Sequence, residues 1–271
     1  MEYQTRKRII IVIVTILILA LLIALIYYLS RPSPSCNDGI RNRDEVGIDC
    51  GGVYCEPCAT RKKIEVVWQK AILVDKDNNI YDLAAQIRNP NPNHGLPQLN
   101  YSFVLKNNSG VEVGRKQGTT FILPDGQKYI IEPFVQAKEP VAFVELQLTE
   151  PLDSDWQKLK EYQSPQVYVK DKNIAIIDQQ SSLAYASGVV QNDTNFDFDT
   201  VWADVVIFGD DNEIIGASKT MIKTLMAGEK RAFSIKIPFR GTIGSSSDMQ
   251  VEVNLFDNDN YMKKFGEPTV Q

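Results

Sequence analysis

LAAQIRN at residues 83–89 and ASGVVQN at residues 186–192 are the two segments that decide the fold of this chain. Each is an apolar run that ends in asparagine, which is typical of a buried strand that leads into a polar loop. They lie 103 residues apart, and LPDGQK at 123–128 matches LMAGEK at 225–230 at an offset of 102. The two offsets differ by one residue, as a one-residue deletion in a loop would produce. We therefore expect two copies of one structural unit.

The sequence around both matches has the pattern of short β-strands. Apolar runs such as 80–87, 101–105 and 141–148 alternate with turns rich in Asn, Asp, Gly and Pro, and no long segment has a helical period. Gly114 and Gly216, also 102 residues apart, mark equivalent strands. This spacing predicts antiparallel β-sandwiches. Convergent β composition is the alternative, because few aligned residues are identical.

The predicted domain boundaries follow the repeat. The first sandwich is placed at residues 61–151 and the second at 162–271. The polar, proline-led segment at 152–161 is predicted to be a linker, with a helical turn around Trp156. Each copy has the size of an ordinary independent domain.

A family resemblance can be named on these residues. The first copy, with IRNPN at 87–91 and YSFVL at 101–105, resembles the late-embryogenesis-abundant type 2 (WHy) domain. The second copy, with GVVQN at 188–192 and LMAGE at 225–229, is similar to bacterial FxLYD-type domains. Both resemblances imply immunoglobulin- or fibronectin-III-like sandwiches. Neither family brings a set of catalytic residues, so the resemblance predicts fold rather than activity.

All four cysteines lie in one short segment, at Cys36, Cys50, Cys55 and Cys58. An even number of clustered cysteines outside the cytoplasm predicts two disulfides, and the sequence leaves the three pairings open. A zinc site is the alternative, although only Cys55 and Cys58 have the usual CxxC spacing. The segment resembles a short motif of bacterial surface proteins, C-x-D-G-x-x-N-x-x-E-x-G-x-D-C-G-G followed by C-x-x-C.

Oxygen-bearing side chains alternate with these cysteines. Asp38, Asn42, Glu45 and Asp49, together with Asp44, are donors of the kind that Ca²⁺ takes. Their spacing does not match an EF-hand, and Asp and Asn are also common turn residues. We therefore predict no metal or cofactor in this segment, with calcium at these four side chains as the alternative.

The apolar run at residues 9–29 is predicted to be one transmembrane helix. At about 1.5 Å per residue, a helix of this length covers roughly 30 Å, which matches the hydrocarbon thickness of a bilayer. Arg6, Lys7 and Arg8 precede the run, so residues 1–8 are expected in the cytoplasm and residues 30–271 outside. A cleaved signal peptide or a lipoprotein anchor at Cys36 are alternatives, but neither cleavage signal is present. We predict an uncleaved signal anchor, followed by a spacer and cysteine-rich knot at 30–60.

The charge distribution bears on the class of partner. Residues 1–30 carry +2 of the overall net charge of −5, so the remainder of the chain carries −7. An acidic ectodomain lacks the electrostatic footprint of nucleic-acid binding, so no nucleic-acid partner is expected.

Residues that could perform catalysis are few. The only histidine, His94, is predicted in a polar loop without a second histidine or a cysteine nearby, and no nucleophile or phosphate-binding motif is present. Asp197, Asp199, Asp210 and Asp211 are predicted to be solvated loop residues. Three glycosylation sequons begin at Asn100, Asn107 and Asn192.

The sequence therefore predicts a signal-anchored cell-surface protein that is not an enzyme. Its expected role is a noncatalytic binding or structural module with a protein or cell-envelope partner. The alternative is a carbohydrate- or cell-wall-directed enzyme that uses Asp and Glu side chains.

Overall fold

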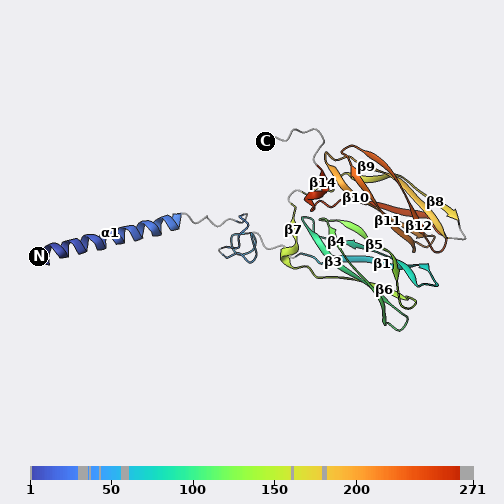
Figure 1. Cartoon of the computed structure of the whole chain (residues 1–271), viewed down its shortest axis with the longest axis horizontal. Helices are drawn as coiled ribbons and strands as arrows, with labels where there is room; N and C mark the ends of the chain where they lie inside the picture. Colours follow the sequence, from blue (N-terminus) through green and yellow to red (C-terminus); the bar gives the residue numbers. More distant parts are fainter. Residues whose placement is uncertain are drawn as a thin grey trace. The chain divides into compact units, whose positions relative to one another are not determined.

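The computed structural model describes residues 2–29, 36, 38–42, 44–55, 61–159, 162–178 and 182–262. The chain forms two compact units, Met1–Arg61 and Lys62–Gln271 (Figure 1). The described part is mainly β, as predicted, with sandwich-like sheets in the second unit.

The first unit contains the helix α1, which spans Glu2–Leu29. It starts seven residues before the predicted apolar run and contains no glycine or proline, so no residue interrupts the helical hydrogen bonds. Among the residues that the structure describes, no helix has the length and apolarity needed to cross a membrane.

The first half of the second unit contains seven strands in two sheets. One sheet has the order β1-β2-β5; the other has the order β4-β3-β6, with β7 paired to the start of β3. All these pairings are antiparallel. The elements are β1 (Glu65–Asp75), β2 (Ile80–Arg88), β3 (His94–Lys106), β4 (Glu112–Ile122), β5 (Gln127–Gln136), β6 (Phe143–Leu148), the 3₁₀ turn η1 (Asp153–Asp155) and β7 (Gln157–Lys158).

The second half repeats this arrangement strand for strand. Its sheets have the orders β8-β9-β12 and β11-β10-β13, with β14 paired to the start of β10. The repeat inferred from sequence is therefore confirmed at the level of strand order. The elements are β8 (Val167–Asp178), β9 (Leu183–Asn192), β10 (Asp197–Gly209), β11 (Ile214–Leu225), β12 (Lys230–Pro238), β13 (Ile243–Glu252), the 3₁₀ turn η2 (Asn258–Asn260) and β14 (Tyr261–Met262).

The structure explains why each repeated segment ends in an asparagine. Asn89 is fully buried at the end of β2, and its amide donates to the carbonyls of His94 (2.7 Å) and Leu123 (2.9 Å). Asn192, its counterpart at the end of β9, is also fully buried and donates to the carbonyls of Phe196 (2.8 Å) and Met226 (3.0 Å). Each amide ties two loops to the end of a strand, because buried carbonyls need a donor.

Alternation along the strands builds a separate core in each half. Leu83, Ala85 and Ile87 of β2 point into the first core, and the odd-numbered residues of β10 from Val201 to Ile207 point into the second. Successive side chains of a strand face opposite sides of the sheet, so these strands must also present a second face.

Part of the predicted linker belongs to the first half. The helical turn η1 ends next to Trp156, whose side chain packs against the first core. The strand β7 then pairs with His94 and Gly95. His94 therefore begins β3 instead of lying in the polar loop where the sequence analysis placed it, because this pairing extends the strand toward its N-terminal end.

The two halves pack against each other through the second faces of their sheets. Ile72, Ala84 and Ile131 of the sheet β1-β2-β5 form one buried cluster with Val206 and Ala217 of the sheet β11-β10-β13. Figure 1 shows strands of the two halves lying side by side in this region. We refer to this contact as the seam.

Candidate functional site

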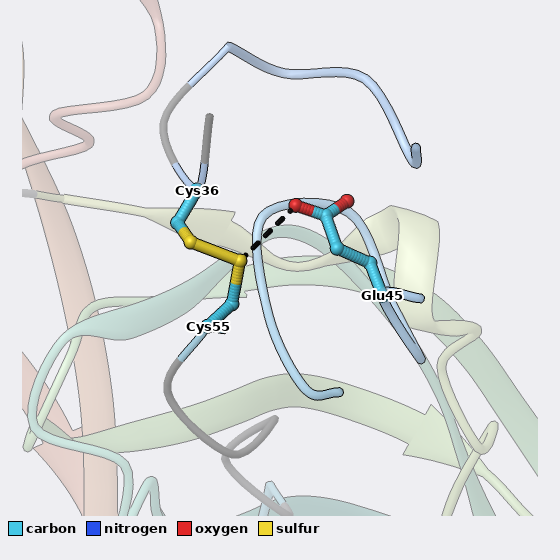
Figure 2. Close-up of side chains that lie close together, drawn as sticks. All are labelled: Cys36, Glu45 and Cys55. Carbon is cyan, nitrogen blue, oxygen red and sulfur yellow. Dashed lines mark hydrogen bonds between the residues drawn. A yellow bond between two sulfur atoms is a disulfide. The ribbon is translucent and has the colours of Figure 1, made fainter. Parts of the chain in front are cut away.

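The cysteine-rich segment contains the Cys36–Cys55 disulfide, with a Cα–Cα distance of 5.6 Å. Cys50 is also disulfide-bonded, and Cys58 lies outside the described residues. Figure 2 shows the carboxylate of Glu45 directed at this disulfide, with Oε1 3.4 Å from the Sγ atom of Cys55. Within the described residues, Cys36, Glu45 and Cys55 are the one group of three potential metal ligands that lie close together. Both sulfurs are in the disulfide, so they are not thiolate ligands in this state.

The proposed calcium ligands hold turns of the knot. Glu45 is buried, and its Oε2 accepts from the backbone N–H groups of Asn42 (3.1 Å) and Asp49 (3.3 Å). The carboxylate of Asp49 accepts from the N–H groups of Asp38 (2.9 Å) and Gly39 (3.0 Å), and Asp38 accepts from the amide of Asn42 (2.8 Å). These contacts explain why the motif needs acidic side chains at these positions.

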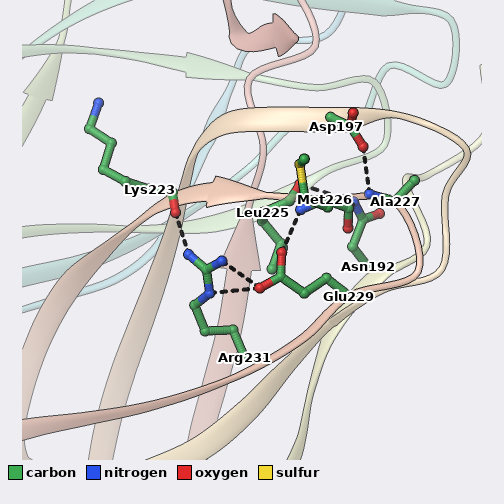
Figure 3. Close-up of polar contacts among 8 residues, drawn as sticks. All are labelled: Asn192, Asp197, Lys223, Leu225, Met226, Ala227, Glu229 and Arg231. Carbon is green, nitrogen blue, oxygen red and sulfur yellow. Dashed lines mark hydrogen bonds and ion pairs between the residues drawn. The ribbon is translucent and has the colours of Figure 1, made fainter. Parts of the chain in front are cut away.

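The four aspartates singled out in the second half do not converge on one site. Asp197 is buried and accepts from the N–H of Ala227 (2.7 Å), beside the loop that Asn192 and Glu229 also hold (Figure 3). Asp199 forms an ion pair with Lys223 (3.1 Å). Hydrogen bonds from Thr200 and Lys223 lower the pKa of Asp199.

The other two aspartates lie in the turn after β10. Asp210 is exposed, and Asp211 accepts from the N–H of Glu213 (3.1 Å). The prediction that all four are solvated loop residues is therefore wrong for Asp197, which the loop at Ala227 covers, and it misplaces Asp199, which lies within β10.

One sequon is blocked by its geometry. The amide of Asn192 is buried and donates to carbonyl oxygens of two loops, so its nitrogen is not available for glycosylation in the folded chain. Asn107, by contrast, is only partly buried, and its amide donates to Glu139 (2.8 Å).

A cleft of about 380 Å³ lies where the seam opens. The face of β10 explains its position, because Thr200, Trp202 and Asp204 line the cleft while Val206 and Phe208, further along the same face, pack in the seam. The apolar end of the strand therefore closes the contact between the halves, and the polar end leaves it open. Its volume falls at the small end of the range of ligand pockets, which is roughly 300 to 1,000 Å³.

Three charged side chains meet in the wall of the cleft. Lys128 of β5 and Glu252 of β13 form an ion pair across the two halves, with Nζ 2.7 Å from Oε2 and side chains only 8% and 12% exposed. Asp204 is 3% exposed and makes a hydrogen bond with Glu252. Burial, then the neighbouring charge of Glu252, raises the pKa of Asp204 well above its usual value. Asp204 therefore keeps its proton to a higher pH than an exposed aspartate does.

The other oxygen of Glu252 agrees with the raised pKa of Asp204. Its Oε1 is buried and has no conventional donor among the described groups. A protonated Asp204 supplies one, because a protonated carboxyl group donates where a carboxylate only accepts.

Aromatic side chains complete the lining. The Nζ of Lys128 lies 3.9 Å from the centroid of the Phe121 ring, and the Nζ of Lys219 lies 5.5 Å from that of Trp202. Tyr101 lies over Gly118, where an added Cβ would come within 2.3 Å of the phenolic oxygen. Glycine at 118 is therefore required for this position of the ring.

The sequence analysis missed Lys128, Asp204 and Glu252. Asp204 is an acidic residue within the apolar sequence of a predicted strand, and this was the one feature of the sequence that could have indicated the site. An acidic residue in a buried strand indicates a paired or protonated carboxyl group.

No protein-family model matches the chain, and no curated protein matches its sequence. Among solved structures, it is similar to a red sea bream transglutaminase at 10% identity, covering 72% of this chain and 30% of that chain, with a TM-score of 0.21. It is also similar to a β-glucuronidase of glycoside hydrolase family 2 at 11% identity, covering 78% of this chain and 25% of that chain, with a TM-score of 0.20. The chain thus spans less than a third of the length of either structure.

Proposed function

We propose that this chain is a noncatalytic binding module of the cell surface, and that its ligand binds in the cleft at the seam. The observation that carries the proposal is the construction of this cleft. Side chains from both halves, Lys128 and Tyr129 on one side and Asp204 and Glu252 on the other, meet around a space of about 380 Å³. Buried charge is costly to maintain, so its placement beside an open space favours a binding role.

The membrane attachment is part of the proposal. Residues 9–29 form the apolar part of α1, and the basic residues Arg6 to Arg8 precede it. This pattern supports a single spanning helix with the N-terminus in the cytoplasm and the second compact unit outside. The disulfides of the knot agree with an oxidising compartment.

We also propose that the two halves are immunoglobulin- or fibronectin-III-like sandwiches of the WHy and FxLYD types. The identical strand order of the halves supports one ancestral unit. The buried asparagine at the end of the second strand of each half gives the resemblance a structural reason.

An acid-dependent hydrolase is the second candidate, and one observation favours it. Burial raises the pKa of Asp204 beside Glu252, and a hydrolase uses such a difference between two neighbouring acids to separate its general acid from its base. Against it, Asp204 and Glu252 are hydrogen-bonded to each other, whereas the two carboxyl groups of most glycosidases stand roughly 5 to 9.5 Å apart. The Lys128 ion pair also occupies the carboxylate.

Site-specific photocrosslinking in intact cells tests the proposal. A photoreactive amino acid at Thr119, an exposed residue of the cleft lining, should capture a ligand, while the same residue at Ser234, exposed on β12, should not. Equal capture at both positions, or capture at neither, would refute a binding role for the cleft. Glycan hydrolysis by the purified chain that is lost in Glu252→Gln would instead establish the hydrolase.

A further inference from the structure

We propose that the cleft binds a neutral, polyhydroxylated ligand, specifically a short oligosaccharide segment. This inference rests on the proposed binding function and adds the chemical class of the ligand. Three properties of the lining carry it: a balanced charge, a partly exposed indole ring, and neutral polar groups supplied by both halves.

The lining contains two lysines and three acids, so opposite charges are nearly balanced in number. Lys128 is paired with Glu252 inside the wall, and burial beside the same carboxylate raises the pKa of Asp204, so this acid loses its proton less readily than an exposed aspartate does. The remaining charged lining residues are Lys219 and Asp257, one of each sign. A cleft with so little net charge gives little electrostatic gain to an anion or a cation that must lose its hydration shell on entry.

The indole of Trp202 supplies an apolar platform. Trp202 lies on the polar end of the β10 face, and unlike Tyr101 and Tyr129 in the same lining, it is not fully buried. Lys219 lies toward one face of the indole, at 5.5 Å from its centroid. A flat aromatic surface beside hydroxyl-binding groups matches a sugar ring, which has apolar C–H groups on its faces and hydroxyls around its edge.

Neutral donors and acceptors surround this platform. Thr119 and Thr120 of β4 contribute hydroxyl groups from the first half, and Asn254 contributes an amide group from the second. The hydroxyl of Thr200, also in the lining, is already bonded to Asp199 and Lys223. A hydroxyl group both donates and accepts, so these side chains suit a ligand that carries many hydroxyls. The size of the cleft, about 380 Å³, favours a short segment over a folded partner surface.

Binding is to be measured with the full-length protein in a zwitterionic detergent, because a maltoside or glucoside detergent would compete as a sugar. The neutral probes are cellotetraose, mannotetraose and the tetramer of N-acetylglucosamine. Tetragalacturonate is the anionic comparison and tetraglucosamine the cationic one. Calorimetry should show binding of at least one neutral tetramer, at least tenfold tighter than either charged tetramer.

Three variants separate the proposed contacts. Trp202→Ala should abolish binding of the neutral tetramer, whereas Tyr185→Ala, a partly exposed aromatic on β9 outside the lining, should leave it unchanged. Asp204→Asn should retain binding, because asparagine is the neutral counterpart of a protonated aspartate. Glu252→Gln leaves Lys128 without its counter-ion and should increase affinity for tetragalacturonate.

Several outcomes would overturn the ligand class. These are failure of every neutral tetramer to bind, tighter binding of a charged tetramer by the unchanged protein, or full binding by Trp202→Ala. If Thr119 still captures a protein or a charged ligand in cells, the cleft remains a binding site and only the oligosaccharide assignment fails. If Thr119 captures nothing in cells, the binding function itself fails.

Discussion

Replacing Asn192 with alanine should lower the stability of the second half more than replacing any exposed residue of the same loop. The amide of Asn192 donates to the carbonyls of Phe196 (2.8 Å) and Met226 (3.0 Å), and its oxygen accepts from the N–H of Thr194 (3.0 Å). The residue is fully buried, so alanine leaves these groups without a partner.

The magnitude follows from counting these three backbone groups. Each buried polar group that loses its partner costs about 1 to 3 kcal/mol, and water entering the loop recovers part of this cost. We therefore expect Asn192→Ala to lower the free energy of unfolding by about 3 to 5 kcal/mol. That is a large share of the roughly 5 to 15 kcal/mol that stabilises a typical domain.

Urea unfolding followed by near-ultraviolet circular dichroism measures this loss. Asn195→Ala is the matched control, because Asn195 is exposed in the same loop and its replacement should change stability by less than about 0.5 kcal/mol. Asn89→Ala should cost as much as Asn192→Ala, since Asn89 makes the equivalent bonds in the first half. A loss below about 1 kcal/mol for Asn192→Ala would show that the loops do not depend on this amide.

Three further predictions concern the seam and the knot. The raised pKa of Asp204 lets the folded chain hold a proton that the unfolded chain releases. The stability of the wild type relative to Asp204→Asn should therefore fall as the pH rises above 3.8, the ordinary pKa of an aspartate. A stability difference that does not change with pH would contradict the raised pKa. Ala217→Arg places a long cation in the buried cluster of the seam and should make residues 159–166 the first site of limited proteolysis, whereas Ser234→Arg, at an exposed position of β12, should not. Peptide mapping without reduction should recover Cys36 joined to Cys55, and Cys36→Ser should render Cys55 alkylatable; a different partner for Cys36 would disprove this pairing.

The strand order was predictable from sequence because the signals that set it are local. Alternating apolar residues, turn residues and the terminal asparagines recur at a constant offset, and each acts within its own half. The structural role of Asn89 and Asn192 also explains why the match is sharpest there. A residue that must satisfy two loop carbonyls tolerates fewer replacements than a core residue, which can exchange with others of similar volume.

The cleft was not predictable because its residues depend on the packing of one half on the other. Lys128 and Lys230 occupy equivalent positions in the repeated segments 123–128 and 225–230. Lys128 is 6% exposed and paired with Glu252, whereas Lys230 is exposed. Two lysines in similar local sequences therefore have different environments. Lys128 is buried because a sheet of the other half packs against it, and this packing cannot be inferred from the local sequence.

Differences between the two copies show which residues serve the seam. The strand registers place Leu105 opposite Gly114 in the first half and Ile207 opposite Gly216 in the second, so β3 and β10 align at an offset of 102. At this alignment, Asn100 corresponds to Trp202, Ser102 to Asp204 and Lys106 to Phe208. The shared positions maintain the fold of each half, whereas these substitutions create the aromatic, acidic and apolar face on which the first half rests. Replacing Trp202 should therefore affect the cleft, and replacing Phe208 the packing of the halves, before either change affects the strand order of a half.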